Sequence, residues 1–152
     1  MTRDEQKQGR KALLRLLEDT KFAVLATQGP EGPYTSLVGI APADALERIA
    51  FATRRDTTKY RNLERNDSAS LLLDDRAARG EDVRRLTAVT LVGHVAESTG
   101  EERARLQRVL EERLPRLSEF ISSEECAVMA MRTEWCRVVS GFQSGIDLQV
   151  DI

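Results

Sequence analysis

Cysteine and histidine are scarce in this sequence, and their scarcity argues against several kinds of site. The 152 residues include two cysteines, Cys126 and Cys136, and one histidine, His94. Two cysteines are too few for a disulfide framework, and their spacing matches no zinc motif, so we expect reduced thiols in strands. One histidine does not predict a transition-metal centre. A Ser-His-Asp or Cys-His site would have to use His94, which lies in a strand-like run and is expected to be a packed or rim residue.

Long apolar runs are also missing. No run approaches the roughly 18 residues that would suggest a membrane span, and the first residues, MTRDEQKQGRK, have no apolar signal core. We therefore expect a cytoplasmic protein without a membrane partner. The isoelectric point of about 5.6 and the aromatic content of 5% argue against a nucleic-acid partner, because such domains are usually basic. No G-x-G-x-x-G fingerprint is present, so the sequence predicts no resident nicotinamide dinucleotide, and any such electron donor would bind only transiently.

The composition is that of a globular protein. Hydrophobic residues make up 41% of the chain and charged residues 32%, which is too apolar for disorder. A chain of this length can bury one sizeable core, and two domains would be cramped. We expect a single domain over residues 1–152.

Hydrophobic patterning predicts a mainly β protein with flanking helices. Thr2 and Glu5 form a capping-box pattern, and the leucines that follow predict a helix over residues 4–18. Strands are expected at 22–27, 34–41, 49–53, 69–74 and 86–97, followed by a helix from Gly100 that Pro115 interrupts. A final hairpin joined near Thr133 and a short polar tail complete the chain. About six strands with short turns favour an antiparallel barrel over a βαβ sheet.

The stretch TRRDTTKYRNLERN, from Thr53 to Asn66, gathers five basic and two acidic residues in a chain with a net charge of −2. A strand ends at Thr53, and after a short loop Thr57 and Thr58 begin a helix that carries Lys59. Free N–H groups and the helix dipole attract anions to a first helical turn, so the pattern predicts a phosphate site. Two alternatives stay open: a simple N-cap beside a solvated basic face, or a nucleic-acid contact.

This stretch and two further segments of the chain form a larger pattern. FATRRDTTKYRNLERNDSASLLLDD, FAVLATQGPEGPYTSLVGI and AVTLVGHVA together resemble the flavin-binding split barrels related to pyridoxamine 5′-phosphate oxidase, over roughly residues 15–97. Thr53 matches a threonine at a strand end, and Thr57-Thr58-Lys59 occupies the place of the phosphate clamp. Leu63 and Asn66 match the helix end, and Gly93 matches a mid-strand glycine. Thr58 stands where the family has a clamp arginine, and Asp67 stands where it has a proline.

The resemblance implies a six-stranded antiparallel split β-barrel that binds FMN at the interface of a homodimer. The residues expected to run along the isoalloxazine and ribityl chain through their backbone groups are Thr35, Ser36, Leu37 and Val38. Those expected to hold the phosphate are Thr53, Thr57, Thr58 and Lys59, with added charge from Arg54 or Arg55. Trp135, Phe142 and Met129 are candidates for the dimer wall or, equally, for the monomer core.

The resemblance leaves the activity open. The Arg-x-His segment that binds pyridoxal substrates in the true oxidases is absent, so that activity is not expected, and no catalytic residue is nominated. One hypothesis is an FMN-dependent oxidoreductase of unknown substrate. A second is a non-enzymatic flavin-binding, electron-transfer or ligand-sensing module. A third is a related barrel that binds haem, deazaflavin or pyridoxal phosphate.

Overall fold

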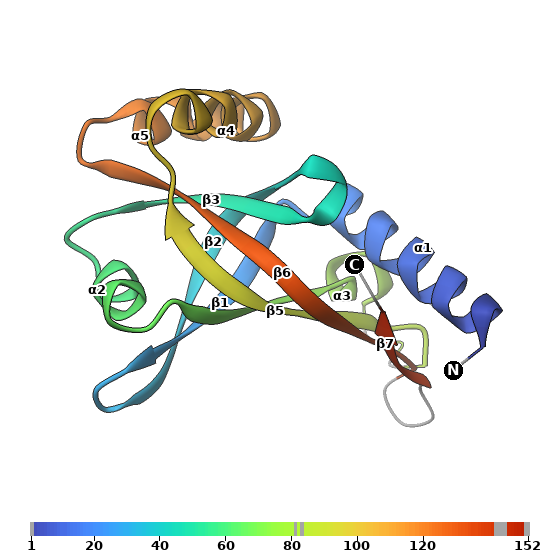
Figure 1. Ribbon diagram of the computed structural model, residues 1–152. Coiled ribbons are helices and arrows are strands. Elements are labelled where there is room, and N and C mark those ends of the chain that lie inside the picture. Colours follow the sequence, from blue (N-terminus) through green and yellow to red (C-terminus); the bar gives the residue numbers. More distant parts are fainter. Residues whose placement is uncertain (1, 81, 83, 142–145, 151–152) are drawn as a thin grey trace.

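The computed structural model describes residues 2–80, 82, 84–141 and 146–150 of the chain. Figure 1 shows a β-barrel with α1 along one side, α2 on the opposite side, and α4 and α5 above it. The strands are β1 (Phe22–Gly29), β2 (Gly32–Ala43), β3 (Arg48–Arg54), β4 (Ser68–Asp74), β5 (Thr87–Glu97), β6 (Cys126–Ser140) and β7 (Ile146–Val150). The helices are α1 (Arg3–Asp19), α2 (Thr58–Arg65), α3 (Arg76–Arg79), α4 (Gly100–Arg113) and α5 (Ser118–Ser122), with 3₁₀ turns η1 (Asp44–Leu46) and η2 (Pro115–Leu117).

The strands form one antiparallel sheet in the order β3-β2-β1-β4-β5-β6-β7, and pairing of β3 with β6 closes six of them into a barrel. Closure removes most of the unpaired strand edges that an open sheet would leave. The expected six-stranded antiparallel split barrel with flanking helices is therefore confirmed. Among the described residues, no helix is both long enough and apolar enough to cross a membrane.

The predicted final hairpin is wrong, because residues 126–140 form a single strand. Val92 on β5 lies opposite Trp135, whereas Gly93 lies opposite Thr133, so Glu134 is an extra residue in β6. Such a β-bulge bends a strand without ending it. The tail, expected to be only short and polar, adds β7 beside β6, and residues 142–145 lie outside the described part of the chain.

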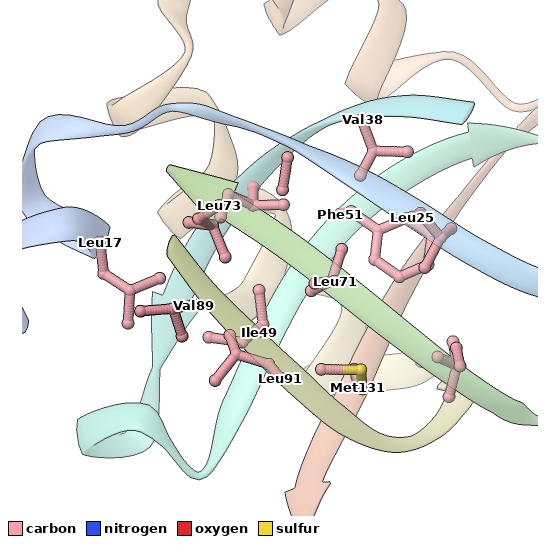
Figure 2. Packing of buried hydrophobic residues seen from close by; sticks show 14 of the residues in the cluster. Leu17, Leu25, Val38, Ile49, Phe51, Leu71, Leu73, Val89, Leu91 and Met131 are labelled. Atoms are coloured by element: carbon pink, nitrogen blue, oxygen red, sulfur yellow. The ribbon is translucent and has the colours of Figure 1, made fainter. Parts of the chain in front are cut away.

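The main core fills the barrel, as Figure 2 shows. Alternate residues of each strand point inward, including Leu25, Phe51 and Leu71, which are fully buried. Leu13, Leu16 and Leu17 of α1 belong to the same cluster, and the predicted capping box at the start of α1 is present. A smaller cluster packs Leu106 and Leu110 of α4 against the outer side of β2, β3 and β6. Both cysteines are buried thiols in β6, as expected.

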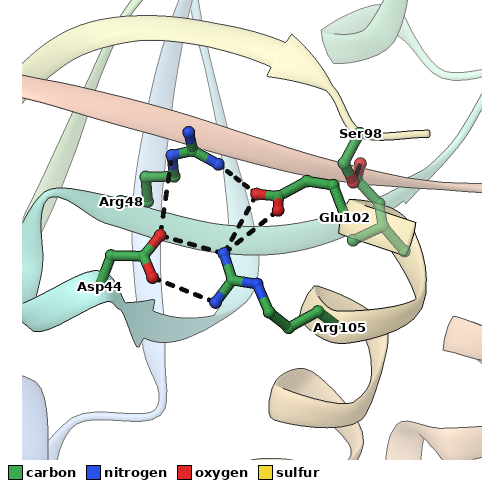
Figure 3. Close-up of polar contacts among 6 residues, drawn as sticks. Asp44, Arg48, Ser98, Glu102 and Arg105 are labelled. Carbon is green, nitrogen blue, oxygen red and sulfur yellow. Dashed lines mark hydrogen bonds and ion pairs between the residues drawn. The ribbon is translucent and has the colours of Figure 1, made fainter. Parts of the chain in front are cut away.

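A four-charge cluster holds the start of α4 against the connection between β2 and β3 (Figure 3). Arg105 donates to both carboxylate oxygens of Asp44 at 3.0 and 3.1 Å and also pairs with Glu102, which in turn pairs with Arg48. Asp44, Ala45 and Leu46 have φ values of 52°, 54° and 89°. Non-glycine residues in this region are strained, so the ion pairs help to hold an unfavourable turn.

Replacing Gly93 by alanine is expected to destabilise the barrel by at least about 2 kcal/mol, because the new atom would overpack the bulge. A Cβ there would lie 2.0 Å from the backbone oxygen of Arg132, whereas the nearest atom to a Cβ on Gly39 would be the flexible end of Leu114, at 2.7 Å. Gly39→Ala is therefore the matched control, with a cost below about 1 kcal/mol. Urea denaturation measures both, and equal midpoints would contradict this reading of the bulge.

Candidate functional site

The first part of β2 has an edge that no described strand covers. β2 pairs with β1 over residues 32–39 but with β3 only over residues 40–43. The last residues of β3, from Ala52 to Arg54, pair with β6 alone. β3 therefore leaves β2 at Phe51, and this separation is the split of the barrel. Backbone N–H and C=O groups on an uncovered strand edge need partners, which makes this edge a place where a ligand can bind.

The register decides which residues face the open edge. The N–H of Ile40 donates to the carbonyl of Lys21 at 2.9 Å, so Ile40 directs its backbone groups toward β1. Antiparallel residues alternate in this respect. Thr35 and Leu37 therefore direct their N–H and C=O groups to the open edge, while Ser36 and Val38 direct theirs to β1.

The side chains of the same four residues alternate across the barrel wall. Leu37 points outward and is 68% exposed, whereas Val38 points into the core and is 4% exposed. Thr35 is exposed on the outer face. The hydroxyl of Ser36 is buried and has no hydrogen-bond partner among the described residues. Such a group is unusual in a native structure and marks unused hydrogen-bonding capacity on this strand.

Two of the predicted phosphate ligands hold the loop between β3 and α2. Thr53 is almost fully buried, and its hydroxyl lies 2.9 Å from that of Thr57. The Thr57 hydroxyl donates to the carbonyl of Arg54 at 2.8 Å and accepts from the N–H of Tyr60, which makes Thr57 the N-cap of α2. The hydroxyls of Thr53 and Thr57 thus already have partners inside the protein.

The two loop arginines are also paired. Arg54 binds both carboxylate oxygens of Asp56 and lies 3.1 Å from Glu125. This bidentate hydrogen bond raises the pKa of Arg54 and lowers that of Asp56. Arg55 binds Glu97 at 2.7 Å. Both guanidinium charges are therefore balanced by carboxylates, so the added charge predicted from Arg54 is largely neutralised.

The remaining predicted residues, Thr58 and Lys59, lie on the first turn of α2. Thr58 is exposed, and Arg61 approaches its hydroxyl at 3.5 Å. Lys59 is half-buried on the helix face shared with Asn62 and Leu63, and it makes no ion pair with any described residue. Lys59 therefore faces the barrel side of α2, unlike the exposed Arg65. Together with the first-turn amides, this lysine and hydroxyl could hold an anion.

Sequence reasoning missed the polar contacts that fasten α2 to the barrel. Asn62 is 2% exposed and donates to the hydroxyl of Thr27 at 3.1 Å. Tyr60 donates to Glu97 at 2.6 Å, and this hydrogen bond raises the pKa of Tyr60. Burial alone would raise the pKa of Glu97, but its hydrogen bonds from Arg55 and Tyr60 outweigh burial and lower it. The one sequence feature that could have predicted these contacts is the polar Asn62, which lies beside Leu63 on the inward face of a short helix.

Apolar side chains line up on the outer face of the barrel next to the open edge. Val24 lies directly opposite Leu37 on one side and Leu72 on the other. Phe22 continues this outer row and is 48% exposed, while Leu72 is 41% exposed. We call Phe22, Val24, Leu37 and Leu72 the outer apolar row.

The three residues considered for a dimer wall lie in different parts of the chain's structure. Met129 belongs to the barrel core and is 3% exposed, so it cannot form an outer wall. Trp135 is half-buried opposite Val92, and Arg137 lies over its ring at 5.8 Å. Phe142 lies outside the described residues.

A closed barrel of six antiparallel strands, opened between β2 and β3, is a split barrel. A family model described as pyridoxamine 5′-phosphate oxidase matches residues 10–140. The chain belongs to this family.

Solved structures share the fold at low sequence identity. The haem-binding protein from Mycobacterium smegmatis has a TM-score of 0.80 and 19% identity, and the match covers 97% of this chain but only 59% of that one. A general stress protein 26-related member of the pyridoxinephosphate oxidase family from Clostridium acetobutylicum has a TM-score of 0.73 and 16% identity, with 96% of each chain covered. The haem storage protein HutZ from Vibrio cholerae has a TM-score of 0.70 and 14% identity, covering 82% of this chain and 89% of that one. Comparison with curated proteins gave no significant match.

His94 lies on β5 as a rim residue between two carboxylates. Its Nδ1 is 2.8 Å from Asp67 and its Nε2 is 3.1 Å from Glu134, the bulge residue. The hydrogen bond to Asp67 and then the charge of Glu134 raise the pKa of His94. No group of three or more His, Cys, Asp or Glu side chains in the described part of the chain is placed to hold a metal ion.

The ring protons of His94 should titrate with a midpoint above the ordinary value of 6.5. Proton NMR can measure this without assignment, because the chain has one histidine. A raised folded pKa stabilises the fold below the unfolded pKa, and that contribution disappears as the pH rises through the folded pKa. The stability advantage of the wild type over His94→Gln should therefore be fully present below the ordinary pKa of 6.5 and should shrink as the pH rises above it.

Two variants separate the effects of Asp67 and Glu134 on the pKa of His94. Asp67→Asn should lower the midpoint more than Glu134→Gln, because the hydrogen bond to Asp67 is the larger contribution. A midpoint at or below 6.5 in the unmodified chain would show that these carboxylates do not act on His94 in solution.

Proposed function

We propose that the protein binds FMN with its phosphate at the first turn of α2 and its flavin ring along the open edge of β2. We further propose that it acts as an FMN-dependent oxidoreductase. The observation that carries the proposal is that α2 lies against the hairpin of β1 and β2, where Asn62 donates to Thr27. This contact brings a strand edge without a partner near a helix start with an unpaired, half-buried Lys59. Family membership agrees with a flavin ligand.

The helix start suits a phosphate because one of the positive groups near it, Lys59, is not already paired. Arg54 and Arg55 are balanced by Asp56, Glu125 and Glu97. Lys59, by contrast, has no described carboxylate partner and is held on the barrel side of α2. The Thr58 hydroxyl and the free first-turn amides would add hydrogen bonds to the lysine charge. In this proposal Thr53, Thr57 and Arg54 shape the loop and do not contact the phosphate.

The open edge of β2 suits the flavin ring because the strand backbone and the polar edge of the ring both carry hydrogen-bond donors and acceptors. Thr35 and Leu37 direct N–H and C=O groups there, and the polar edge of an isoalloxazine presents both kinds of group. When bound, FMN supplies hydride or single-electron transfer, while the protein supplies binding, orientation and electrostatics. A non-enzymatic flavin carrier would use the same residues, and turnover with NADH or NADPH separates the two.

Haem is the second candidate ligand, favoured by the haem-binding proteins among the structural neighbours. His94 is the only histidine of the chain. Both of its ring nitrogens lie within hydrogen-bonding distance of a carboxylate, so ligation of a haem iron would have to displace Asp67 or Glu134. Haem ligation would thus break an existing contact, whereas Lys59 at the start of α2 is unpaired among the described residues, and this difference favours FMN.

The outer apolar row supports a homodimer as the assembled form. Leu37, Val24 and Leu72 lie side by side across three strands, and Leu37 is 68% exposed. A contiguous apolar face beside a ligand site is typical of an interface. A second copy of the chain would bury this row and would enclose a flavin bound at the neighbouring edge.

The double variant Thr58→Ala/Lys59→Ala is expected to weaken FMN binding by more than about tenfold, since each charge-assisted hydrogen bond contributes about 1.5–3 kcal/mol. Quenching of flavin fluorescence measures the affinity. Arg65→Ala is the matched control, because it removes one positive charge from the exposed end of the same helix. Unchanged affinity in the double variant would remove the proposed phosphate site.

The mass in solution is expected to be near twice 17.0 kDa. Leu72→Asp should shift the mass to that of a monomer, because it places a charge in the outer apolar row. Leu14→Asp should stay dimeric, since Leu14 is similarly exposed, at 46%, but lies on α1. Light scattering after gel filtration measures all three chains. A monomeric wild type that still binds FMN would refute the interface.

A further inference from the structure

A cleft of about 560 Å³ is lined by residues of α1 and α3. Figure 1 shows these two helices on the side of the barrel away from α2. Its walls are one face of α1, the start of β1, the end of β4, and α3. The volume is within the range of small-molecule sites, about 300–1,000 Å³. Nothing in the flavin proposal uses this cleft, because the predicted flavin residues lie on β2, on the loop after β3 and on α2.

The cleft has an apolar lining drawn from three elements. Ala12 and Leu16 come from α1, Phe22 from the start of β1, and Ala77 and Ala78 from α3. Phe22 is 48% exposed although it is a large aromatic residue. A second hollow of about 170 Å³ shares Phe22 and Ala77 with the cleft and continues to Leu37 and Leu72. Leu37 and Leu72 belong to the outer apolar row that the proposed dimer would cover, so the apolar body of a ligand would stay in the cleft itself.

The charges around the cleft leave a positive surplus. Lys11, Arg15 and Lys21 line it and form no ion pair with a described residue. The acids on the opposite wall are already used, because Asp74 pairs with Arg76, and Asp75 accepts from the Thr87 N–H at 2.8 Å and pairs with Arg79. Asp19 is the remaining acid of the lining. The lining therefore has three unpaired cations and one unpaired carboxylate.

We propose that this cleft binds an amphipathic organic anion, with a carboxylate held by Lys11 and Arg15 and an aliphatic or aromatic body over Leu16, Phe22 and Ala78. The class follows from the combination of an apolar lining and a cationic rim. The described lining contains no His, Cys, Met or Tyr that could ligate iron. The ligand is therefore an organic acid and not a haem, and the site is separate from the proposed flavin site.

The test uses 11-(dansylamino)undecanoate, a fatty acid analogue whose fluorescence rises in an apolar site. Saturable binding is expected, and octanoate should displace the probe while 1-octanol, which has no charge, should not. Lys11→Gln/Arg15→Gln should weaken probe binding about tenfold or more. Lys7→Gln/Arg10→Gln is the matched control, because it removes two positive charges from α1 outside the cleft lining, and it should stay within about twofold of the wild type.

A second variant tests the cleft itself, because it blocks the space without removing a charge. Ala78 is exposed on α3, so Ala78→Trp should fill the cleft without disturbing the barrel core, and probe binding should be lost while the thermal midpoint stays unchanged. The proposal is overturned by any of three results: no saturable binding to the wild type, equal displacement by octanoate and octanol, or equal losses in the two charge variants. FMN affinity, measured on the same variants, should not change, so a failed flavin proposal would leave this result interpretable.

Discussion

The departure of β3 from β2 is the constraint on which the candidate site depends. β3 pairs with β2 for four residues, from Arg48 to Phe51, and then continues along β6. The first part of β2 is left with an edge whose backbone groups have no strand partner in the described chain. Because α2 follows β3 after a short loop, the same departure places α2 beside the hairpin of β1 and β2. There the contact between Asn62 and Thr27 fastens it.

The charges near α2 are divided between arginines that form ion pairs and a lysine that forms none with the described residues. Arg54 and Arg55 link the loop to Glu125, Glu124 and Glu97, which lie far along the chain. Lys59 is the basic residue of the first turn that these contacts leave available. A positive stretch in a slightly acidic chain therefore has two uses: some of its arginines close the loop, and the helix start keeps an unpaired ammonium. The cleft at the other side of the barrel shows a similar division, with Arg79 paired and Lys11 and Arg15 unpaired.

Local patterns predicted the elements well and the contacts between them poorly. The capping box at Thr2, the N-cap at Thr57 and the alternating strands depend on neighbouring residues, and each could be read from the chain. The bulge at Glu134 could not, because a bulge is defined by the register of the partner strand, so the break near Thr133 suggested a turn. The pairing of Arg54 with Glu125 joins residues about 70 positions apart, and no local pattern reveals it. Register also decides that Thr35 and Leu37, and not Ser36 and Val38, face the open edge.

We propose that the open edge of β2 and the start of α2 together hold FMN. The most direct measurement is the absorption spectrum of the purified protein after it has been mixed with FMN and desalted. We expect flavin bands that remain with the protein at about one FMN per chain, because a phosphate site and a strand edge would hold the cofactor through desalting. A folded protein that emerges colourless, with all of the FMN in the small-molecule fraction, would contradict it.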